Sequence, residues 1–165
     1  MKTNPNHPAV YIPPPLIGLV IFLFSFVIQR WVVINHSYLY HFIAHIIGWI
    51  FVLLSLFFGM SGVFRFLRTN NTVETFRSAS SLQTTGIYTI SRNPMYVGLV
   101  CLYTGLSLLI GNWWTIIFIP LFIIILQLYV IQREEIYLQY TFGEQYANYK
   151  KKVRRWIGKR KKVSR

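Results

Sequence analysis

Acidic side chains are scarce in this chain of 165 residues, which has 17 Lys and Arg but only 4 Asp and Glu, giving a formal net charge of +13. Charged residues of both signs make up 13% of the sequence, about half of their share in a typical soluble domain. Hydrophobic residues make up 54%, and the mean hydropathy is +0.44. This composition argues against a soluble domain and indicates a membrane protein.

Cysteine is nearly absent as well. The single Cys101 lies in an apolar run, so the sequence excludes a disulfide framework, and we interpret this residue as a small core side chain. The apolar run 16–28 near the N-terminus is followed by Gln29-Arg30-Trp31 and not by a small-residue cleavage site. We therefore interpret it as a retained membrane span and not as a signal peptide.

Four apolar segments approach or reach the ~20 residues that a transmembrane helix needs. They are residues 14–34, 42–64, 94–110 and 113–131. Only Gly111-Asn112 separates the last two, so we expect a tight turn and a helical hairpin there. Pro120 should kink the fourth helix. The sequence thus predicts an all-α polytopic membrane protein with four transmembrane helices, a C-terminal helical hairpin and a cytoplasmic amphipathic helix.

The distribution of positive charge predicts the orientation. With four spans both termini lie on one side, and that side carries every Lys and Arg except Arg30. Cytoplasmic loops carry the excess of Lys and Arg in membrane proteins. The sequence therefore predicts a multi-pass protein with both termini in the cytoplasm. Along the chain we expect an N-terminal helix pair (1–68), a core of loop, hairpin and C-terminal helix (69–157) and a basic tail (158–165).

The stretch 86–98, with the sequence GIYTISRNPMYVG, passes from a polar loop into an apolar run. Asn is a favoured N-cap and Pro a favoured first helical residue, so we expect a helix to begin at Pro94 with Asn93 as its cap. Helix N-termini attract anionic ligand groups. The predicted hairpin brings Glu134 and Glu135 to the same end. Adjacent helical residues point ~100° apart, so we expect one glutamate to face a pocket and the other to pair with an arginine.

The two blocks together resemble the isoprenylcysteine carboxyl methyltransferase and phospholipid methyltransferase family of integral membrane enzymes. The family pattern is Arg-His-Pro-x-Tyr-x-Gly, a hairpin, and then Glu-Glu-x-x-Leu-x-x-x-Phe-Gly-x-x-Tyr-x-x-Tyr. The residues that match it are Arg92, Pro94, Tyr96, Gly98, Glu134, Glu135, Leu138, Phe142, Gly143, Tyr146 and Tyr149. The resemblance covers about residues 81–157, nearly half of the chain.

The resemblance implies an S-adenosylmethionine-dependent methyltransferase that holds its cofactor on the cytoplasmic side. It also implies a lipid-like or prenylated small acceptor with a carboxylate, thiol or amine. The positions that correspond to the family's cofactor contacts are Ser81, Leu82, Gln83, Tyr88, Asn93, Pro94, Met95, Tyr96 and Glu134. We assign no catalytic base.

The chain departs from the family pattern at two positions. Asn93 stands where histidine is common, which keeps a hydrogen-bonding side chain but removes a titratable one. Val130 stands where the prenylcysteine enzymes carry the arginine that grips the substrate carboxylate. The second departure argues against a prenylcysteine carboxylate as the acceptor.

Two other functions are compatible with parts of the sequence. A non-enzymatic membrane protein with a basic tail that binds anionic lipid or a partner leaves the paired motif blocks unexplained. The sterol reductases share a similar C-terminal motif, but they are much longer proteins. We interpret the basic segment 150–165 as a surface helix on anionic lipid, with no nucleic-acid partner. His41 and His45 have helical spacing but no evident third ligand, so we predict no metal site.

Overall fold

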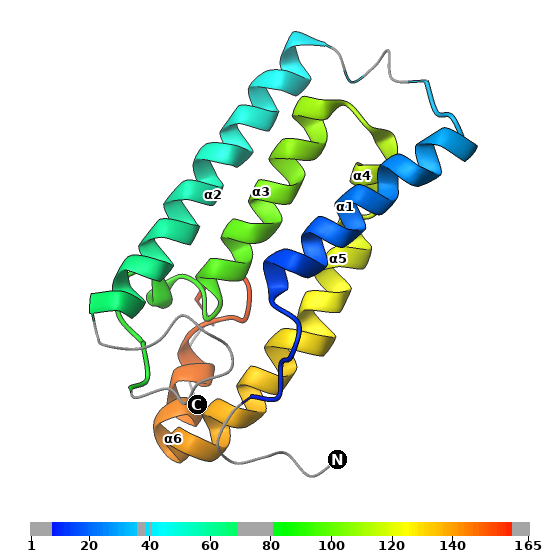
Figure 1. Ribbon diagram of the computed structural model, residues 1–165. Coiled ribbons are helices and arrows are strands. Elements are labelled where there is room, and N and C mark those ends of the chain that lie inside the picture. The colour runs from blue at the N-terminus through cyan, green and yellow to red at the C-terminus, as the bar shows by residue number, and fades with distance from the viewer. Residues whose placement is uncertain (1–7, 36–38, 40, 69–80, 160–165) are drawn as a thin grey trace, which may run out of the picture.

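The computed structural model describes residues 8–35, 39, 41–68 and 81–159, except for the side chains of 63–68. Within these residues the chain is helical and contains no strand. The elements in order are α1 (Pro14–Trp31), α2 (Phe42–Arg68), the 3₁₀ helix η2 (Gly86–Thr89), α3 (Pro94–Ile110), α4 (Trp113–Ile117), α5 (Ile119–Ile125), the π-helical segment η3 (Leu126–Ile131) and α6 (Gln132–Lys152). The predicted all-α fold is confirmed (Figure 1).

Among the described residues, three helical stretches are long and apolar enough to cross a membrane. They are Pro14–Trp31, Phe42–Gly62 and the run Trp113–Lys152, which comprises α4 to α6 and whose N-terminal part is the apolar one. The fourth expected span is α3, an apolar helix of 17 residues, which falls below the length of the other three. The structure therefore supports an integral membrane protein with three long spans and one shorter apolar helix packed among them.

Close packing of α2 against α3 fixes the position of the α3 N-terminus. Small residues let the two backbones approach: a Cβ added to Gly98 would lie 2.8 Å from the backbone N of Gly59, and one added to Gly105 would lie 2.8 Å from the carbonyl O of Gly48. Nearer the start of α3, a Cβ on Gly62 would lie 2.7 Å from the Cγ of Met95. A side chain at Gly98 or Gly105 would meet the α2 backbone and push α3 away from α2.

The expected tight turn between α3 and α4 is present. Gly111 adopts a left-handed conformation with φ of 72°, and the side chain of Asn112 accepts a hydrogen bond of 2.9 Å from the backbone N of Trp114. The helix is then interrupted at Phe118, two residues before Pro120, which has no N–H to donate. This interruption lies close to the kink expected at Pro120, and the kink itself stays a prediction. The π-helical η3 that follows was not expected.

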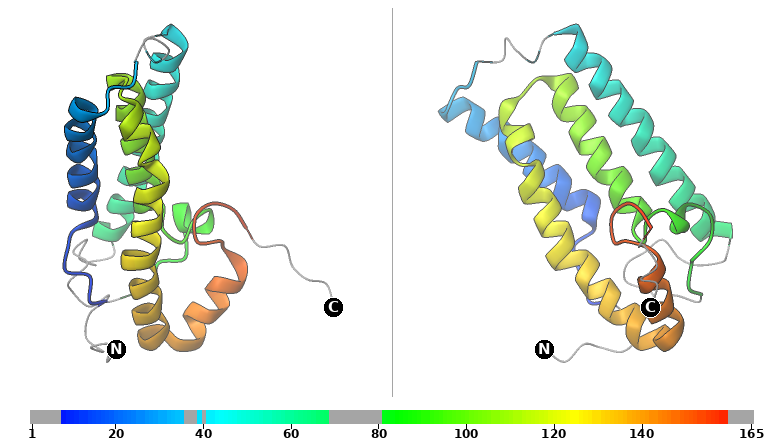
Figure 2. Two further views of the ribbon diagram at one scale, coloured as in Figure 1. Left: turned by 90° about the vertical axis from the view of Figure 1, so that its right-hand side faces the viewer. Right: turned by 180° about the vertical axis from the view of Figure 1, so that it is seen from behind.

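A second bend, at Gly143, divides α6 into two halves. Gly143 has φ of 49° and ψ of −120°, a conformation that residues with a Cβ rarely adopt. Figure 2 shows that the second half of α6 turns away from the transmembrane bundle and runs back toward the loop that precedes α3. This bend brings residues after Gly143 beside the candidate site.

The helix expected over 150–165 ends at Lys152, so the prediction of a surface helix is wrong for residues 153–159. These residues, which we call the C-terminal turn, fold back on themselves: Val153 pairs with Lys159, and the backbone N of Arg154 donates to the carbonyl of Gly158 at 2.8 Å. The turn is held in this shape because its backbone bonds to the loop before α3. Residues 160–165 lie outside the described residues.

Candidate active site

Four parts of the chain meet at the end of the bundle opposite the Gly111-Asn112 turn (Figure 1). They are the loop 81–93, which we call the site loop, the start of α3, the beginning of α6 and the C-terminal turn. At their centre the hydroxyl of Tyr96 donates a hydrogen bond of 2.5 Å to Oε1 of Glu134. The two motif blocks, which are separated by the whole hairpin, are therefore in direct contact.

Glu135 is held by two arginines. Its Oε1 lies 3.0 Å from Nη2 of Arg92 and accepts a hydrogen bond of 2.9 Å from Nε of Arg155, and its Oε2 lies 2.6 Å from Nη2 of Arg155. The Glu135 side chain is 10% exposed and that of Arg92 is 4% exposed. Hydrogen bonding to this carboxylate raises the pKa of Arg155 above its ordinary value. The expectation that one glutamate of the pair would bind an arginine is confirmed for Glu135.

The second half of α6 contributes a tyrosine to the same network. Nη1 of Arg92 donates a hydrogen bond of 3.2 Å to the hydroxyl of Tyr146, a residue that is only 1% exposed. Tyr149, one turn further, donates from its hydroxyl to the carbonyl of Tyr88 at 2.6 Å. The bend at Gly143 is what allows both tyrosines to reach the site loop.

The C-terminal turn is bonded to the site loop along its backbone. The backbone N of Arg92 donates to the carbonyl of Arg154 at 3.2 Å, and the N of Gly158 donates to the carbonyl of Ile90 at 2.7 Å. Beyond these bonds, Nε1 of Trp156 donates to Oε1 of Gln127 in η3 at 3.0 Å. The turn is therefore an integral part of the site and not a free tail.

Asn93 does not cap α3 with its side chain, although α3 begins at Pro94 as expected. The residue occupies the N-cap position but makes no side-chain cap hydrogen bond. Its Nδ2 donates to the carbonyl of Arg155 at 3.0 Å. The predicted N-cap position is confirmed, but the side-chain cap hydrogen bond is absent, because the returning C-terminal turn holds this side chain through an acceptor that lies far away in sequence.

The predicted cofactor-binding residues fall into two sets. Tyr96 and Glu134 meet at the start of α3, where Pro94 is fully buried and Met95 faces α2. The loop residues form the second set. Nε2 of the buried Gln83 donates to Oγ of Ser81 at 2.9 Å. Leu82 packs against a hydrophobic cluster made of Ile87, Tyr88, Tyr146, Tyr149 and Val153.

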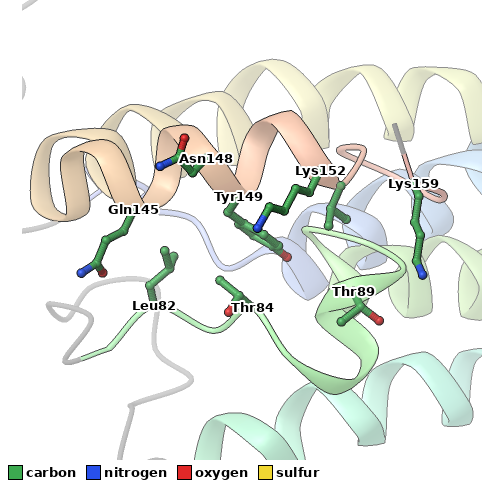
Figure 3. A pocket seen from close by; sticks show the side chains of 9 residues that line it. Leu82, Thr84, Thr89, Gln145, Asn148, Tyr149, Lys152 and Lys159 are labelled. Atoms are coloured by element: carbon green, nitrogen blue, oxygen red, sulfur yellow. The ribbon is translucent and has the colours of Figure 1, made fainter. Parts of the chain in front are cut away.

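A pocket of about 550 Å³ opens between the site loop, the second half of α6 and the C-terminal turn (Figure 3). Of the predicted cofactor residues, Leu82 is the one that lines it. Among the other lining residues, Tyr149 belongs to the family motif, and Lys152, Val153 and Lys159 belong to the segment that the sequence assigned to anionic lipid. Within the described residues no group of three or more His, Cys, Asp or Glu side chains is arranged to hold a metal ion.

Sequence reasoning missed Arg155, Trp156 and the bend at Gly143. The charge of the basic run and the apolar residues within it, among them Val153 and Trp156, indicate a surface helix on lipid, whereas in the structure these two side chains pack at the site. The similarity to the methyltransferase family extended to Ile157. That extent was the available signal that these residues belong to the site.

The comparison with known families agrees with this geometry. The phospholipid methyltransferase family model matches residues 43–145, which is more than half of the chain. The chain belongs to the phospholipid methyltransferase family. The resemblance inferred from the two motif blocks is thus confirmed, and the protein is an integral membrane member of a methyltransferase family.

Two curated relatives match shorter regions of this family member. An uncharacterized protein of Haemophilus influenzae is 38% identical over 63 residues, which are 38% of this chain and 100% of that protein. The protein-S-isoprenylcysteine O-methyltransferase of Schizosaccharomyces pombe is 40% identical over 75 residues, which are 44% of this chain and 30% of that enzyme. The matched region thus spans less than a third of the yeast enzyme. No solved structure matches the chain.

Proposed function

We propose that this protein transfers a methyl group from S-adenosylmethionine to a lipid-like acceptor at the membrane. The observation that carries the proposal is the contact between Tyr96 and Glu134, because it joins the two blocks of the family motif in one site at the start of α3. Membership of the phospholipid methyltransferase family supports the same reaction class.

The residues at the site suit the chemical groups of this cofactor. Both ion pairs that glutamates form among the described residues involve Glu135, so no arginine competes for the Glu134 carboxyl group, which can accept a hydrogen bond from an ammonium or a ribose hydroxyl. The rings of Tyr88 and Tyr96 suit a sulfonium cation, and the N-terminus of α3 suits a carboxylate. We propose that the nine residues assigned from the family resemblance hold the cofactor, with Asn93 contributing by fixing the C-terminal turn.

The cofactor supplies an electrophilic methyl group on sulfur, and the chain's own task is to position the acceptor against it and to exclude water. Positioning alone converts a bimolecular step into an effectively unimolecular one, which accounts for much of the rate in such transfers. A carboxylate or thiolate acceptor needs no base at neutral pH, whereas a protonated amine does. The Arg92–Glu135–Arg155 network keeps the site loop in place and leaves Glu134 to the ligand.

The surroundings of Val130 support an acceptor other than a prenylcysteine carboxylate. Val130 is 0% exposed and packs in an apolar cluster with Phe122, Leu126 and Ile131. Arg133, the nearest arginine in sequence, donates from Nη1 to the carbonyl of Ala9 at 2.7 Å and lies over the ring of Tyr129. Neither position offers a free guanidinium to a substrate carboxylate.

Titration calorimetry of S-adenosylmethionine into the purified protein in detergent tests the proposal. Glu134→Gln keeps the shape of the side chain and removes its charge, and a hydrogen bond to a charged group contributes ~1.5–3 kcal/mol. We expect the affinity to fall roughly 10- to 150-fold. The exposed Glu144 supplies the control, because Glu144→Gln should leave the affinity unchanged. Wild-type affinity in Glu134→Gln would reject this site as the cofactor site.

A further inference from the structure

The pocket beside the site loop has a composition of its own. Figure 3 shows Leu82, Thr84 and Thr89 of the loop facing a row of side chains from the second half of α6. Gln145, Asn148 and Lys152 lie on this row at helical spacing, and Lys159 of the C-terminal turn completes the wall. A volume of about 550 Å³ is within the range of small-molecule sites.

The charge of the lining is wholly positive. Lys152 and Lys159 line the pocket, and no acidic side chain does. The ion pairs among the described residues join Glu135 to Arg92 and Arg155 and do not include either lysine. Two ammonium groups with hydroxyl and amide neighbours form a site for an anion, and the number of donors suits a phosphate ester.

The wall that carries Lys159 is fixed before any ligand arrives. Val153 pairs with Lys159 across the C-terminal turn, and Gly158 adopts a φ of 110° that permits the tight reversal. The backbone N of Gly158 also donates to the carbonyl of Ile90 at 2.7 Å. Lys159 is therefore attached to a rigid turn, so less conformational entropy is lost when it binds.

Apolar surface lies in the same pocket. Leu82, Tyr149 and Val153 line it, and the last two belong to the buried hydrophobic cluster. An occupant with both an anionic and an apolar part matches this lining better than a fully hydrated anion does. Because α3 begins at Pro94, directly after the site loop, the pocket lies where the apolar helices end and lipid head groups begin.

We propose that this pocket is an accessory site for the phosphate-bearing head group of an anionic phospholipid, distinct from the Tyr96–Glu134 contact and sharing only Leu82 with the nine proposed cofactor residues. Lys152 and Lys159, on different sides of the pocket, supply the positive charge that attracts the phosphate, and the leucine, valine and tyrosine side chains contact the glycerol region. The overall charge of +13 draws anionic lipid to the protein, and the pocket gives one such lipid a defined position. Binding at this pocket differs from general attraction to a basic tail because it depends on two particular lysines, Lys152 and Lys159.

The test titrates the purified full-length protein, in neutral detergent, with short-chain phosphatidic acid, short-chain phosphatidylcholine and glycerol 3-phosphate. A basic residue near an anionic lipid contributes ~1 kcal/mol, which is about fivefold in affinity. We expect Lys152→Gln and Lys159→Gln each to weaken phosphatidic acid binding about fivefold and the double variant roughly 25-fold. Lys151→Gln is the matched control, since Lys151 is exposed and does not line the pocket.

The results separate the alternatives. Saturable binding of phosphatidic acid that is weaker in Lys152→Gln and Lys159→Gln and unchanged in Lys151→Gln would support the proposal. Much weaker binding of phosphatidylcholine and of glycerol 3-phosphate would support it as well. An equal loss in Lys151→Gln would show diffuse attraction and overturn it. Equal affinity for glycerol 3-phosphate would identify a soluble phosphate ester as the ligand and reject the lipid. Competitive displacement by S-adenosylmethionine would place the cofactor in this pocket and reject a separate site, while leaving the methyltransferase proposal intact.

Discussion

Glu135→Gln is the substitution that tests most directly how the site is held together. The variant keeps the shape of the side chain but leaves Arg92, whose side chain is 4% exposed, without its carboxylate. Removing one member of a buried ion pair costs about 3–5 kcal/mol, and the remaining amide oxygen favours the lower end of that range. We expect a loss of about 3 kcal/mol, or roughly 6–12 °C in the melting temperature for a chain of this size.

Arg155→Gln should cost less, because its side chain is 30% exposed and water screens the interaction. We expect about 1 kcal/mol for this variant. Melting temperatures in detergent would be measured for both variants and their double variant, with Glu144→Gln as an exposed control. The affinity for S-adenosylmethionine should fall less in Glu135→Gln than in Glu134→Gln. A melting temperature equal to that of the Glu144→Gln control would refute the buried network as a source of stability.

Three further predictions follow from the fold. Gly143→Ala should lower the free energy of unfolding by about 1–3 kcal/mol and weaken cofactor binding, because φ of 49° with ψ of −120° strains any residue with a Cβ. Gly59→Ala is the control, because its Cβ would meet open space, and it should show neither loss in the same melting and calorimetry experiments. Truncation after Lys152 removes the C-terminal turn and should abolish S-adenosylmethionine binding, whereas truncation after Lys159 should preserve it. Binding of S-adenosylmethionine by the protein truncated after Lys152 would show that the C-terminal turn is dispensable. Reporter fusions after Arg165 and within residues 35–41 should place both termini in the cytoplasm, and a translocated C-terminal reporter would contradict the predicted orientation.

The sequence alone was sufficient for the features that depend on local pattern. The bilayer requires long apolar runs, so the helices could be located from hydropathy, and Gly111 and Pro94 marked a turn and a helix start because their backbone preferences are intrinsic. The pairing of the two motif blocks was also predictable, since a hairpin with a two-residue turn must return the chain to the same end. The family could also be recognised from the sequence, because each of its two motif blocks is contiguous in the chain.

Only the tertiary structure decided which side chains bind one another. Asn93 reaches a carbonyl 62 residues away in sequence, and Glu135 binds an arginine 20 residues further along the chain. These contacts depend on the bend at Gly143, which reverses the second half of α6 and carries the C-terminal turn back to the site loop. Local propensity assigns Asn93 to a helix cap and the basic residues to solvent or lipid. A hydrogen-bond partner that arrives from a distant part of the chain overrides both preferences, because a buried polar group must be paired.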